Sequence, residues 1–165
     1  MIFTEPRDPR FMRRHRGGSL TEADHRLLAL WAAACAEHVL PLYEAEHPGD
    51  RRPREAVALA RAWARGEIGA RAAMAAGQGR AAAREVGGAP KFVALAAAQA
   101  VAVAHVAQHE LGAAAYAIRA REAAEGAAAA RAERDWQRAE LPEPIRALVL
   151  DDQRLRNHAC WGVFG

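Results

Sequence analysis

Eighteen consecutive residues, Phe92 to His109, contain no acidic residue, Lys or Arg. The polar side chains within this run are those of Gln99, His105, Gln108 and His109. Alanine and branched apolar residues occupy every angle around a helix drawn through the run, so no charged face is left for water. The run therefore predicts a buried central helix, over about residues 91–124, whose few polar groups need partners inside the protein.

The composition of the whole chain favours a helical fold. Its 165 residues suffice for one domain with its own core, and 52% of them are hydrophobic, yet only 6% are aromatic. Much of the hydrophobic fraction is alanine, which suits closely packed helices better than a sheet. We expect an all-α, single-domain helical bundle of about five to six helices around the central helix.

Local signals indicate where several of these helices begin. Thr21 stands three residues before an acid and can accept a hydrogen bond as an N-terminal cap, which predicts that a first helix starts here. Asp50 can cap a second helix, in which Pro53 takes an early position. Two glycines weaken a third helical segment, residues 68–86, and a final helix is expected over residues 145–157.

The net charge of +3 comes from one end of the chain. Residues 1–16 carry five Arg against two acids, so this segment alone is +3 and the remaining residues sum to zero. We divide the chain into a basic N-terminal arm (1–18), a helical domain (19–157) and an apolar C-terminal tail (158–165). Short basic arms are usually solvated, which disfavours nucleic-acid binding. The tail is expected to dock on its own domain, with a homodimer through the tail as the alternative.

Two features favour a cytoplasmic protein. The Arg-rich start lacks the apolar segment of a secretory signal, and the alanine-dominated run is too weakly apolar to span a bilayer. The two cysteines, Cys35 and Cys160, predict no disulfide. We therefore expect a reducing compartment and no membrane association.

Two histidines in the uncharged run have a spacing that can bind metal. His105 and His109 are four residues apart, so on one helix they would lie one turn apart. His38 is the best-placed third ligand, because the helical pattern puts it on an inner face. The spacing resembles that of DinB-like four-helix metal proteins and would predict one divalent metal such as zinc. The simpler interpretation is that these imidazoles are structural and that no cofactor is bound.

The remaining polar candidates also have structural interpretations. Asp24 and His25 fall in the first turn of a helix, where capping explains them better than acid–base catalysis does. The charged candidates for a partner surface stand together: Asp50, Arg51, Arg52 and Arg54. They could contact an acidic partner or a phosphate, or form a solvated turn. The sequence contains no nucleophile elbow, phosphate-binding loop, dinucleotide fingerprint or paired cysteines, so we expect no catalytic activity.

Several ordered segments together resemble one protein family. They are Ala23 to Ala33, Cys35 to Pro41, Asp50 to Arg54, Ala62-Trp63, Ala104 to His109 continuing to Ala117, and Glu133 to Gln137. In this order they resemble the immunity-five-like group of immunity proteins from bacterial polymorphic-toxin systems, over about residues 20–150. The resemblance implies an all-α protein that neutralises a co-produced toxin by binding it, with no reaction of its own.

The resemblance also carries over individual residues. They are Asp24, His25, Glu37, His38, Asp50, Arg52, Trp63, His105, His109 and Trp136. All of them except Asp50 and Arg52, together with Gln99, are expected to be buried or structural. Many nuclease inhibitors are acidic, whereas this body is neutral and its arm basic, so the expected target is a neutral or acidic toxin.

Three functions are open at this point. The first is a non-catalytic immunity protein whose partner is a cognate toxin. The second is a metal-binding bundle or metal-dependent enzyme that uses His38, His105 and His109, and the third is a structural dimer or scaffold. Imidazoles that converge in a pocket would favour metal, whereas histidines bonded to backbone or carboxylates in a dry core would favour an inhibitor or scaffold.

Overall fold

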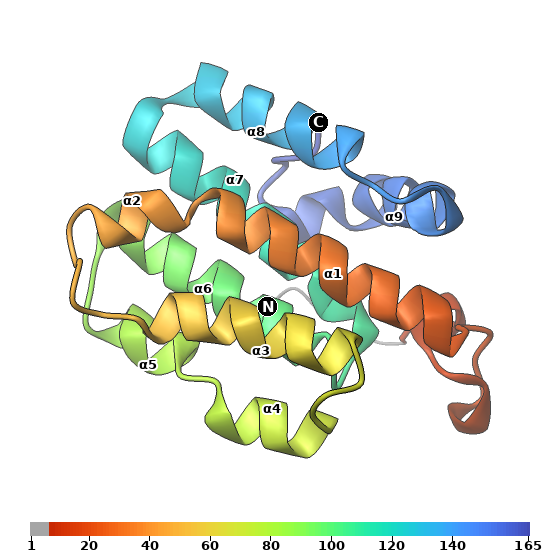
Figure 1. Cartoon of the computed structure of the whole chain (residues 1–165). Coiled ribbons are helices and arrows are strands. Elements are labelled where there is room, and N and C mark those ends of the chain that lie inside the picture. The colour runs from red at the N-terminus through yellow and green to blue at the C-terminus, as the bar shows by residue number, and fades with distance from the viewer. Residues whose placement is uncertain (1–6) are drawn as a thin grey trace.

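Helices form the regular structure of residues 7–165, which are the part of the chain that the computed structural model describes (Figure 1). The α-helices are α1 (Glu22–His38), α2 (Leu40–Glu44), α3 (Arg52–Ala64), α4 (Ala70–Ala76), α5 (Gly79–Arg84), α6 (Gly88–Ala102), α7 (Glu110–Glu125), α8 (Ala127–Ala139) and α9 (Glu143–Arg156). Short 3-10 helices are η1 (Pro9–Phe11), η2 (Arg14–Arg16), η3 (Ala107–His109) and η4 (Asn157–Cys160). The predicted all-α class is confirmed, although short helices bring the number in these residues above the expected five to six.

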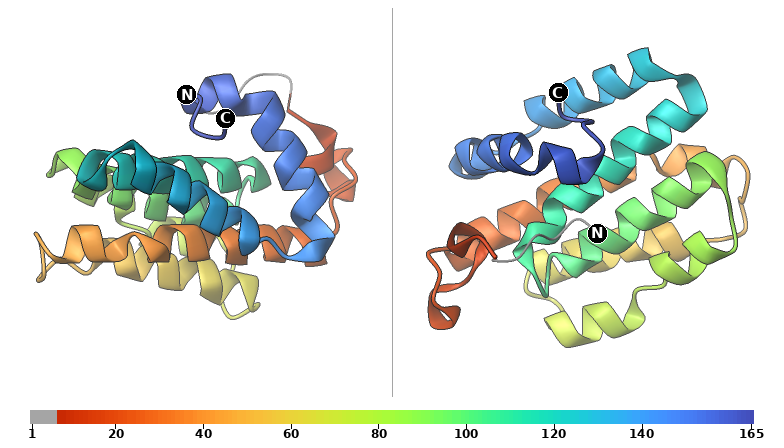
Figure 2. Two further views of the ribbon diagram at one scale, coloured as in Figure 1. Left: turned by 90° about the horizontal axis from the view of Figure 1, so that it is seen from above. Right: turned by 180° about the vertical axis from the view of Figure 1, so that it is seen from behind.

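The segment predicted as one central helix is instead two helices, α6 and α7, which fold back on each other (Figure 2). Val106 has an extended backbone (φ −137°, ψ 112°) that separates them. His25 Nε2 donates to the Val103 carbonyl oxygen, 2.6 Å away, so α1 satisfies a carbonyl at the end of α6. The run contains no Gly or Pro and is buried on both sides of this turn, so the residue pattern does not mark the break.

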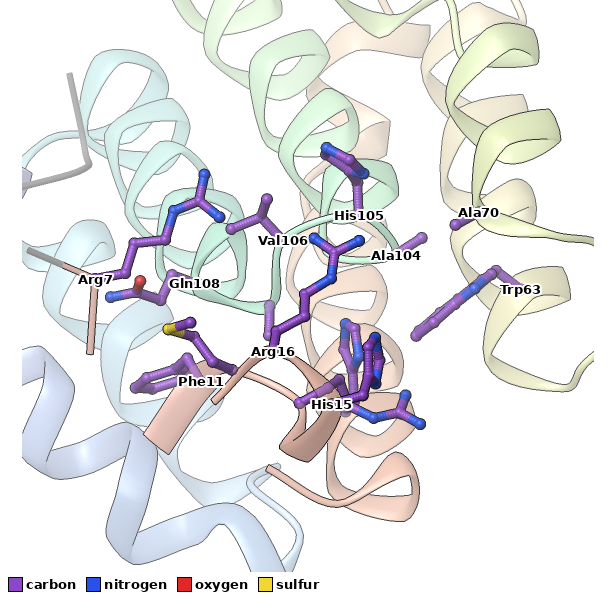
Figure 3. A pocket seen from close by; sticks show the side chains of 14 residues that line it. Arg7, Phe11, His15, Arg16, Trp63, Ala70, Ala104, His105, Val106 and Gln108 are labelled. Carbon is purple, nitrogen blue, oxygen red and sulfur yellow. The ribbon is translucent and has the colours of Figure 1, made fainter. Parts of the chain in front are cut away.

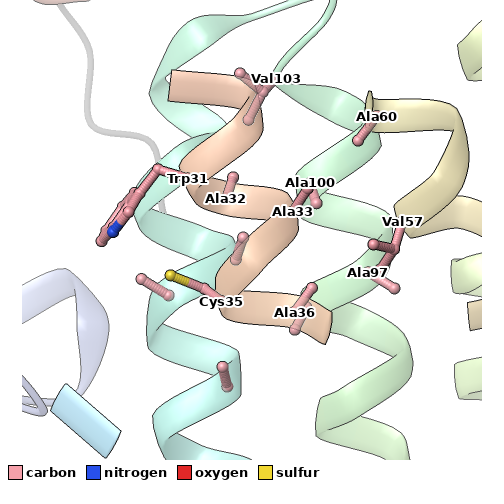
Figure 4. Close-up of a cluster of buried hydrophobic side chains, with 14 of the residues drawn as sticks. Trp31, Ala32, Ala33, Cys35, Ala36, Val57, Ala60, Ala97, Ala100 and Val103 are labelled. Carbon is pink, nitrogen blue, oxygen red and sulfur yellow. The ribbon is translucent and has the colours of Figure 1, made fainter. Parts of the chain in front are cut away.

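The centre of the fold consists of α1, α6 and α7, each packed against the other two. α3 covers α1 and α6, α5 packs on α6, and α8 packs on α7 (Figure 2). Figure 4 labels part of the core: Trp31, Ala32, Ala33, Cys35 and Ala36 of α1, with Val57, Ala60, Ala97, Ala100 and Val103 around them. The small side chains let the helix backbones come close together. In the described residues, no helix has the length and apolar character needed to cross a membrane.

The N-terminal segment packs on the helical body rather than extending into solvent. Phe11 is 4% exposed, and Leu20 N donates to the Met12 carbonyl oxygen at 2.9 Å. Arg10 binds Asp8 and also reaches Asp151 of α9, with Nη1 2.8 Å from Asp151 Oδ2. The expected solvated arm is therefore corrected for residues 7–18, while residues 1–6 of that arm lie outside the described part of the chain.

The apolar C-terminal tail docks on its own domain, as expected. Cys160 and Phe164 are buried. The Phe164 carbonyl oxygen accepts from Arg138 Nη2 at 2.7 Å, and its amide donates to Asn157 Oδ1 at 2.9 Å. Trp161 differs from them because it is 50% exposed and has a left-handed backbone (φ 57°).

The segment expected as one loose helix, residues 68–86, divides into α4 and α5 at Gly77 and Gln78. Gly79, the first residue of α5, lies directly against α6. A Cβ atom added to it would be 2.9 Å from both the Ala94 carbonyl oxygen and the Ala98 amide nitrogen. Both are backbone atoms of a buried helix, so neither can move away easily.

We predict that Gly79→Ala lowers the free energy of unfolding by about 1–3 kcal/mol, the usual cost of forcing volume into a packed interior. Urea denaturation measures this change. Gly87→Ala is the matched control, because an added Cβ there meets nothing within 4 Å. Equal losses in the two variants would contradict the close contact of α5 with α6.

Candidate functional site

The three histidines considered as metal ligands lie in different parts of the fold. His38 ends α1, His105 is exposed in the turn after α6, and His109 directly precedes α7. Arg121 Nη2 donates to the His38 carbonyl oxygen, and Arg121 is about 18 Å along α7 from His109. Within residues 7–165, no group of three or more His, Cys, Asp and Glu side chains is placed to hold a metal ion. The geometry therefore gives the metal alternative no support.

His38 instead joins α1 to α8. Its Nδ1 lies 2.7 Å from Glu133 Oε2, and its ring stacks on Trp136 with the centroids 3.6 Å apart. The Glu133 side chain is 1% exposed, and Arg121 Nε also approaches Glu133 Oε2 at 3.4 Å. His38 and Trp136 thus contact each other where α1 meets α8, and that their role is structural stays a prediction.

His25 is buried at the other end of α1. Its ring lies beside Trp63 of α3, with the centroids 4.7 Å apart, and its Nδ1 has no hydrogen-bond partner. Burial lowers the pKa of His25, and the charges of Arg13 and Arg26 lower it further. The predicted cap of this helix is confirmed, because Asp24 N donates to Thr21 Oγ1 at 3.1 Å.

His109 and Gln99 form a pair inside the α6–α7 hairpin. His109 Nδ1 lies 2.7 Å from Gln99 Oε1, and since the amide oxygen can only accept, Nδ1 carries the proton. Burial lowers the pKa of His109 to about 4, and the nearby charges of Arg80 and His105 act in the same direction. The ring is therefore neutral at neutral pH.

The residues considered for a partner surface form an ion-pair network at the start of α3. Asp50 Oδ1 accepts from Arg52 N at 3.0 Å and from Arg52 Nε at 2.9 Å. The N-cap position of α3 is Arg51 rather than the expected Asp50, which binds the first amide of the helix from one residue earlier. The Tyr43 hydroxyl donates to Asp50 Oδ2 at 2.5 Å, and Arg52 also binds Glu85 at 2.6 and 3.0 Å. The Arg52 hydrogen bonds hold the pKa of Asp50 far below its usual value.

Neighbouring charges continue this network along α3. Arg54 binds Glu44 through two hydrogen bonds of 2.6 and 2.7 Å. Glu37 is not buried; its side chain is 45% exposed and binds Arg61, so its role is that of a structural ion pair. Arg51 differs from Arg52 and Arg54. Its side chain is 71% exposed, and its Nε lies 4.0 Å from Glu55 Oε1, at the outer limit for an ion pair.

A buried ionic cluster on α7 and α9 was missed by the sequence analysis. Arg156 donates from Nε to Asp152 Oδ1 at 2.7 Å, and its Nη2 lies 3.6 Å from Glu110 Oε1. The three side chains are 0–6% exposed. Burial, together with the Asp152 carboxylate, raises the pKa of Glu110 well above its usual value. The available signal was an acid placed directly after an uncharged run and an Asp–Arg pair four residues apart on the last helix.

A cationic cavity of about 190 Å³, which we call the arginine pocket, lies where the N-terminal segment meets the α6–α7 turn (Figure 3). Its polar lining residues are Arg7, Arg13, His15, Arg16, His25, Trp63, His105 and Gln108. Figure 3 shows Arg7 and Arg16 both reaching toward the turn that carries Val106. The pocket brings together His25, Trp63 and His105, which sequence reasoning treated separately, and it depends on the docked arm that sequence reasoning placed in solvent.

Comparison with known families is decisive for the overall assignment. The sequence model of the family described as "Imm-5 like putative immunity protein" matches residues 18–144, which is more than half of the chain. The chain belongs to this family. Searches of curated proteins and of solved structures find no match.

The span of the Imm-5-like match divides the arginine pocket. His25, Trp63 and the α6–α7 turn lie inside the matched residues, whereas Arg7, Arg13 and Arg16 precede them. The C-terminal tail and nearly all of α9 also lie outside the match. This Imm-5-like protein therefore has terminal segments, packed on the family's helical body, that add features of their own.

We predict opposite effects for two substitutions in the buried cluster. Arg156→Gln lowers the free energy of unfolding by about 3–5 kcal/mol, because it removes the cation that binds the buried Asp152 carboxylate. Glu110→Gln leaves stability at neutral pH unchanged or raises it. The pKa of Glu110 is higher in the folded chain than in the unfolded one, so the folded state binds the extra proton and stability falls as the pH rises above the usual Glu pKa.

Urea denaturation at about pH 5 and about pH 8 measures both effects. The free energy of unfolding of Glu110→Gln, relative to that of wild type, should be larger at the higher pH. Other groups titrate over the same range, so this difference, rather than either curve alone, is the quantity to compare. A Glu110→Gln variant as unstable as Arg156→Gln would contradict the assignment.

Proposed function

We propose that this protein neutralises a cognate bacterial toxin in the cytoplasm by binding it directly, without catalysing a reaction. The observation that carries the proposal is the family match over residues 18–144. Immunity by binding requires a stable scaffold with an ordered surface and no reacting group. The all-α body, with its close-packed central helices, supplies such a scaffold.

The arrangement of the histidines supports binding over metal-dependent chemistry. His25 is engaged by a backbone carbonyl, His38 by a carboxylate and His109 by an amide. These contacts hold helices together, as expected for structural histidines in a core. We therefore infer that the function needs no metal cofactor.

The surface we propose for the toxin is the charged loop that leads into the first turn of α3: Asp50, Arg51, Arg52 and Arg54. Arg52 and Arg54 are already bound to carboxylates, so their positions are ordered before a partner arrives, and less side-chain entropy is lost on binding. Arg51 extends into solvent beside them. A neutral or acidic toxin surface fits this loop by charge.

A homodimer through the tail stays a prediction. Cys160 and Phe164 are buried in the tail's own domain, which leaves Trp161 as the large apolar tail residue that a second copy could contact. Sedimentation equilibrium of wild type and Trp161→Ser distinguishes the two states. A dimer that persists in the variant would exclude this route to dimerisation.

The direct test uses the cognate toxin, which we expect a neighbouring gene to encode. We predict that wild-type protein forms a complex with the toxin and restores growth on co-expression, and that Arg51→Glu weakens the complex by about tenfold. The Arg51 side chain makes no hydrogen bond in the described residues and lies 4.0 Å from Glu55, so its reversal should leave the fold intact. Surface plasmon resonance gives the affinities, and Arg71→Glu, which reverses an exposed charge on α4, is the matched control.

The two parts of the proposal fail separately. If wild-type protein neither binds nor neutralises the toxin, the immunity function is wrong. If it binds and Arg51→Glu has no more effect than Arg71→Glu, the function holds and the toxin contacts another face.

A further inference from the structure

The arginine pocket concentrates positive charge without an acidic side chain to offset it from within. Among the residues described, its lining includes three arginines and three histidines but no Asp or Glu. Arg13 approaches an acid just outside the pocket, at 3.6 Å from Glu22 Oε2, whereas Arg7 and Arg16 form no ion pair within residues 7–165. Elsewhere on this protein most arginines contact carboxylates closely. A cavity lined by one sign of charge focuses the field and attracts counter-ions.

Two buried polar atoms in the same lining also lack partners. His25 is 6% exposed and its Nδ1 accepts or donates no hydrogen bond, while Gln108 is 4% exposed and its Oε1 is unbonded. Buried polar groups are nearly always hydrogen-bonded, and leaving them unpaired costs free energy. The Gln108 amide can present its nitrogen instead of its oxygen by turning over. Gln108 can thus serve as a donor to a ligand in the pocket, and His25 can donate from Nδ1 when its ring is protonated.

We propose that the arginine pocket binds a small dianionic oxyanion, the chemistry shared by a phosphate monoester and a short dicarboxylate. Guanidinium groups match the geometry of such oxygens through paired N–H donors. The volume of about 190 Å³ suits a group of this size better than a large ligand. Arg7 and Arg16 provide charge from the arm, while His25 and Gln108 provide donors from the body.

His25 makes binding depend on pH. Its Nε2 proton is held by the Val103 carbonyl oxygen, so the neutral ring has no proton at Nδ1. The charged and titratable groups around this ring are Glu22 and Arg26 of α1, Arg13, His15 and Arg16 of the N-terminal segment, and His105 of the α6–α7 turn. A bound anion offsets the positive charge of the arginines around the His25 ring. It thereby favours the protonated ring, which can donate a hydrogen bond from Nδ1. Affinity should therefore rise as the pH falls toward the usual pKa of histidine.

This inference does not rest on the proposed immunity function, because its test measures ligand binding directly. Isothermal titration calorimetry of the full chain with sodium sulfate, in a low-chloride buffer, is the first experiment. Sulfate stays dianionic across the range used, so a change between about pH 8 and about pH 6 reports the protein. We expect saturable binding that is tighter at the lower pH.

Substitutions locate the site. Arg16→Gln should weaken sulfate binding by about tenfold, whereas Arg14→Gln, which removes the same charge two residues away and outside the pocket lining, should change it less than about twofold. His25→Gln should reduce the pH dependence by more than His15→Gln or His105→Gln, the other imidazoles of the lining, does. Arg16 is exposed, so its variant keeps the test informative even if the His25 variant does not fold.

Inorganic phosphate and malonate then identify the source of the anion. Tighter binding of phosphate than of malonate assigns a phosphate-bearing ligand, and the reverse order assigns a dicarboxylate. Absence of saturable binding, or equal losses in Arg16→Gln and Arg14→Gln, would overturn the proposal. Binding that is unchanged between the two pH values would overturn the role given to His25.

Discussion

The reversal of the chain between α6 and α7 is the constraint on which the rest of this structure depends. It occurs inside a run with no charged residue, and the His25 hydrogen bond to the Val103 carbonyl oxygen is made at that point. Because the chain turns there, α7 lies back along α6, and both pack against α1. Each of the polar groups at this end of the fold is placed by the turn, including the Gln99–His109 pair and the arginine pocket.

Charge is organised differently at the two ends of the molecule. Around Asp50, Arg52 and Glu85 the opposite charges contact one another closely, and these exposed pairs contribute more to ordering the loop than to stability. At the arginine pocket, Arg13 lies 3.6 Å from Glu22, whereas Arg7 and Arg16 have no acidic partner among residues 7–165. The buried Glu110–Asp152–Arg156 cluster is a third case, with two carboxylates and one arginine, so that protonation of Glu110 relieves the imbalance.

The parts of the fold that sequence could predict are those set by neighbouring residues. Thr21 acts as the cap expected of it, and the apolar tail docks as its composition indicates. The turn at Val106 could not be predicted, because a run buried on every side has no periodic polar face whose interruption would show. Two partners were also out of reach, Glu133 of His38 and Glu110 of Arg156, since each is distant in sequence and meets its partner only in the folded chain. The docked N-terminal segment depends likewise on a long-range contact, that of Arg10 with Asp151.

We propose that His25 and His109, near the α6–α7 turn, hold the fold together and that none of the histidines at this turn binds metal. It is tested most directly by the metal content of protein purified without an affinity tag, measured for wild type, His105→Ala and His109→Ala. We predict no stoichiometric metal in any of the three, with His109→Ala destabilised through loss of its Gln99 contact and the exposed His105→Ala close to wild type. Near-stoichiometric metal in wild type that disappears in both variants would contradict it.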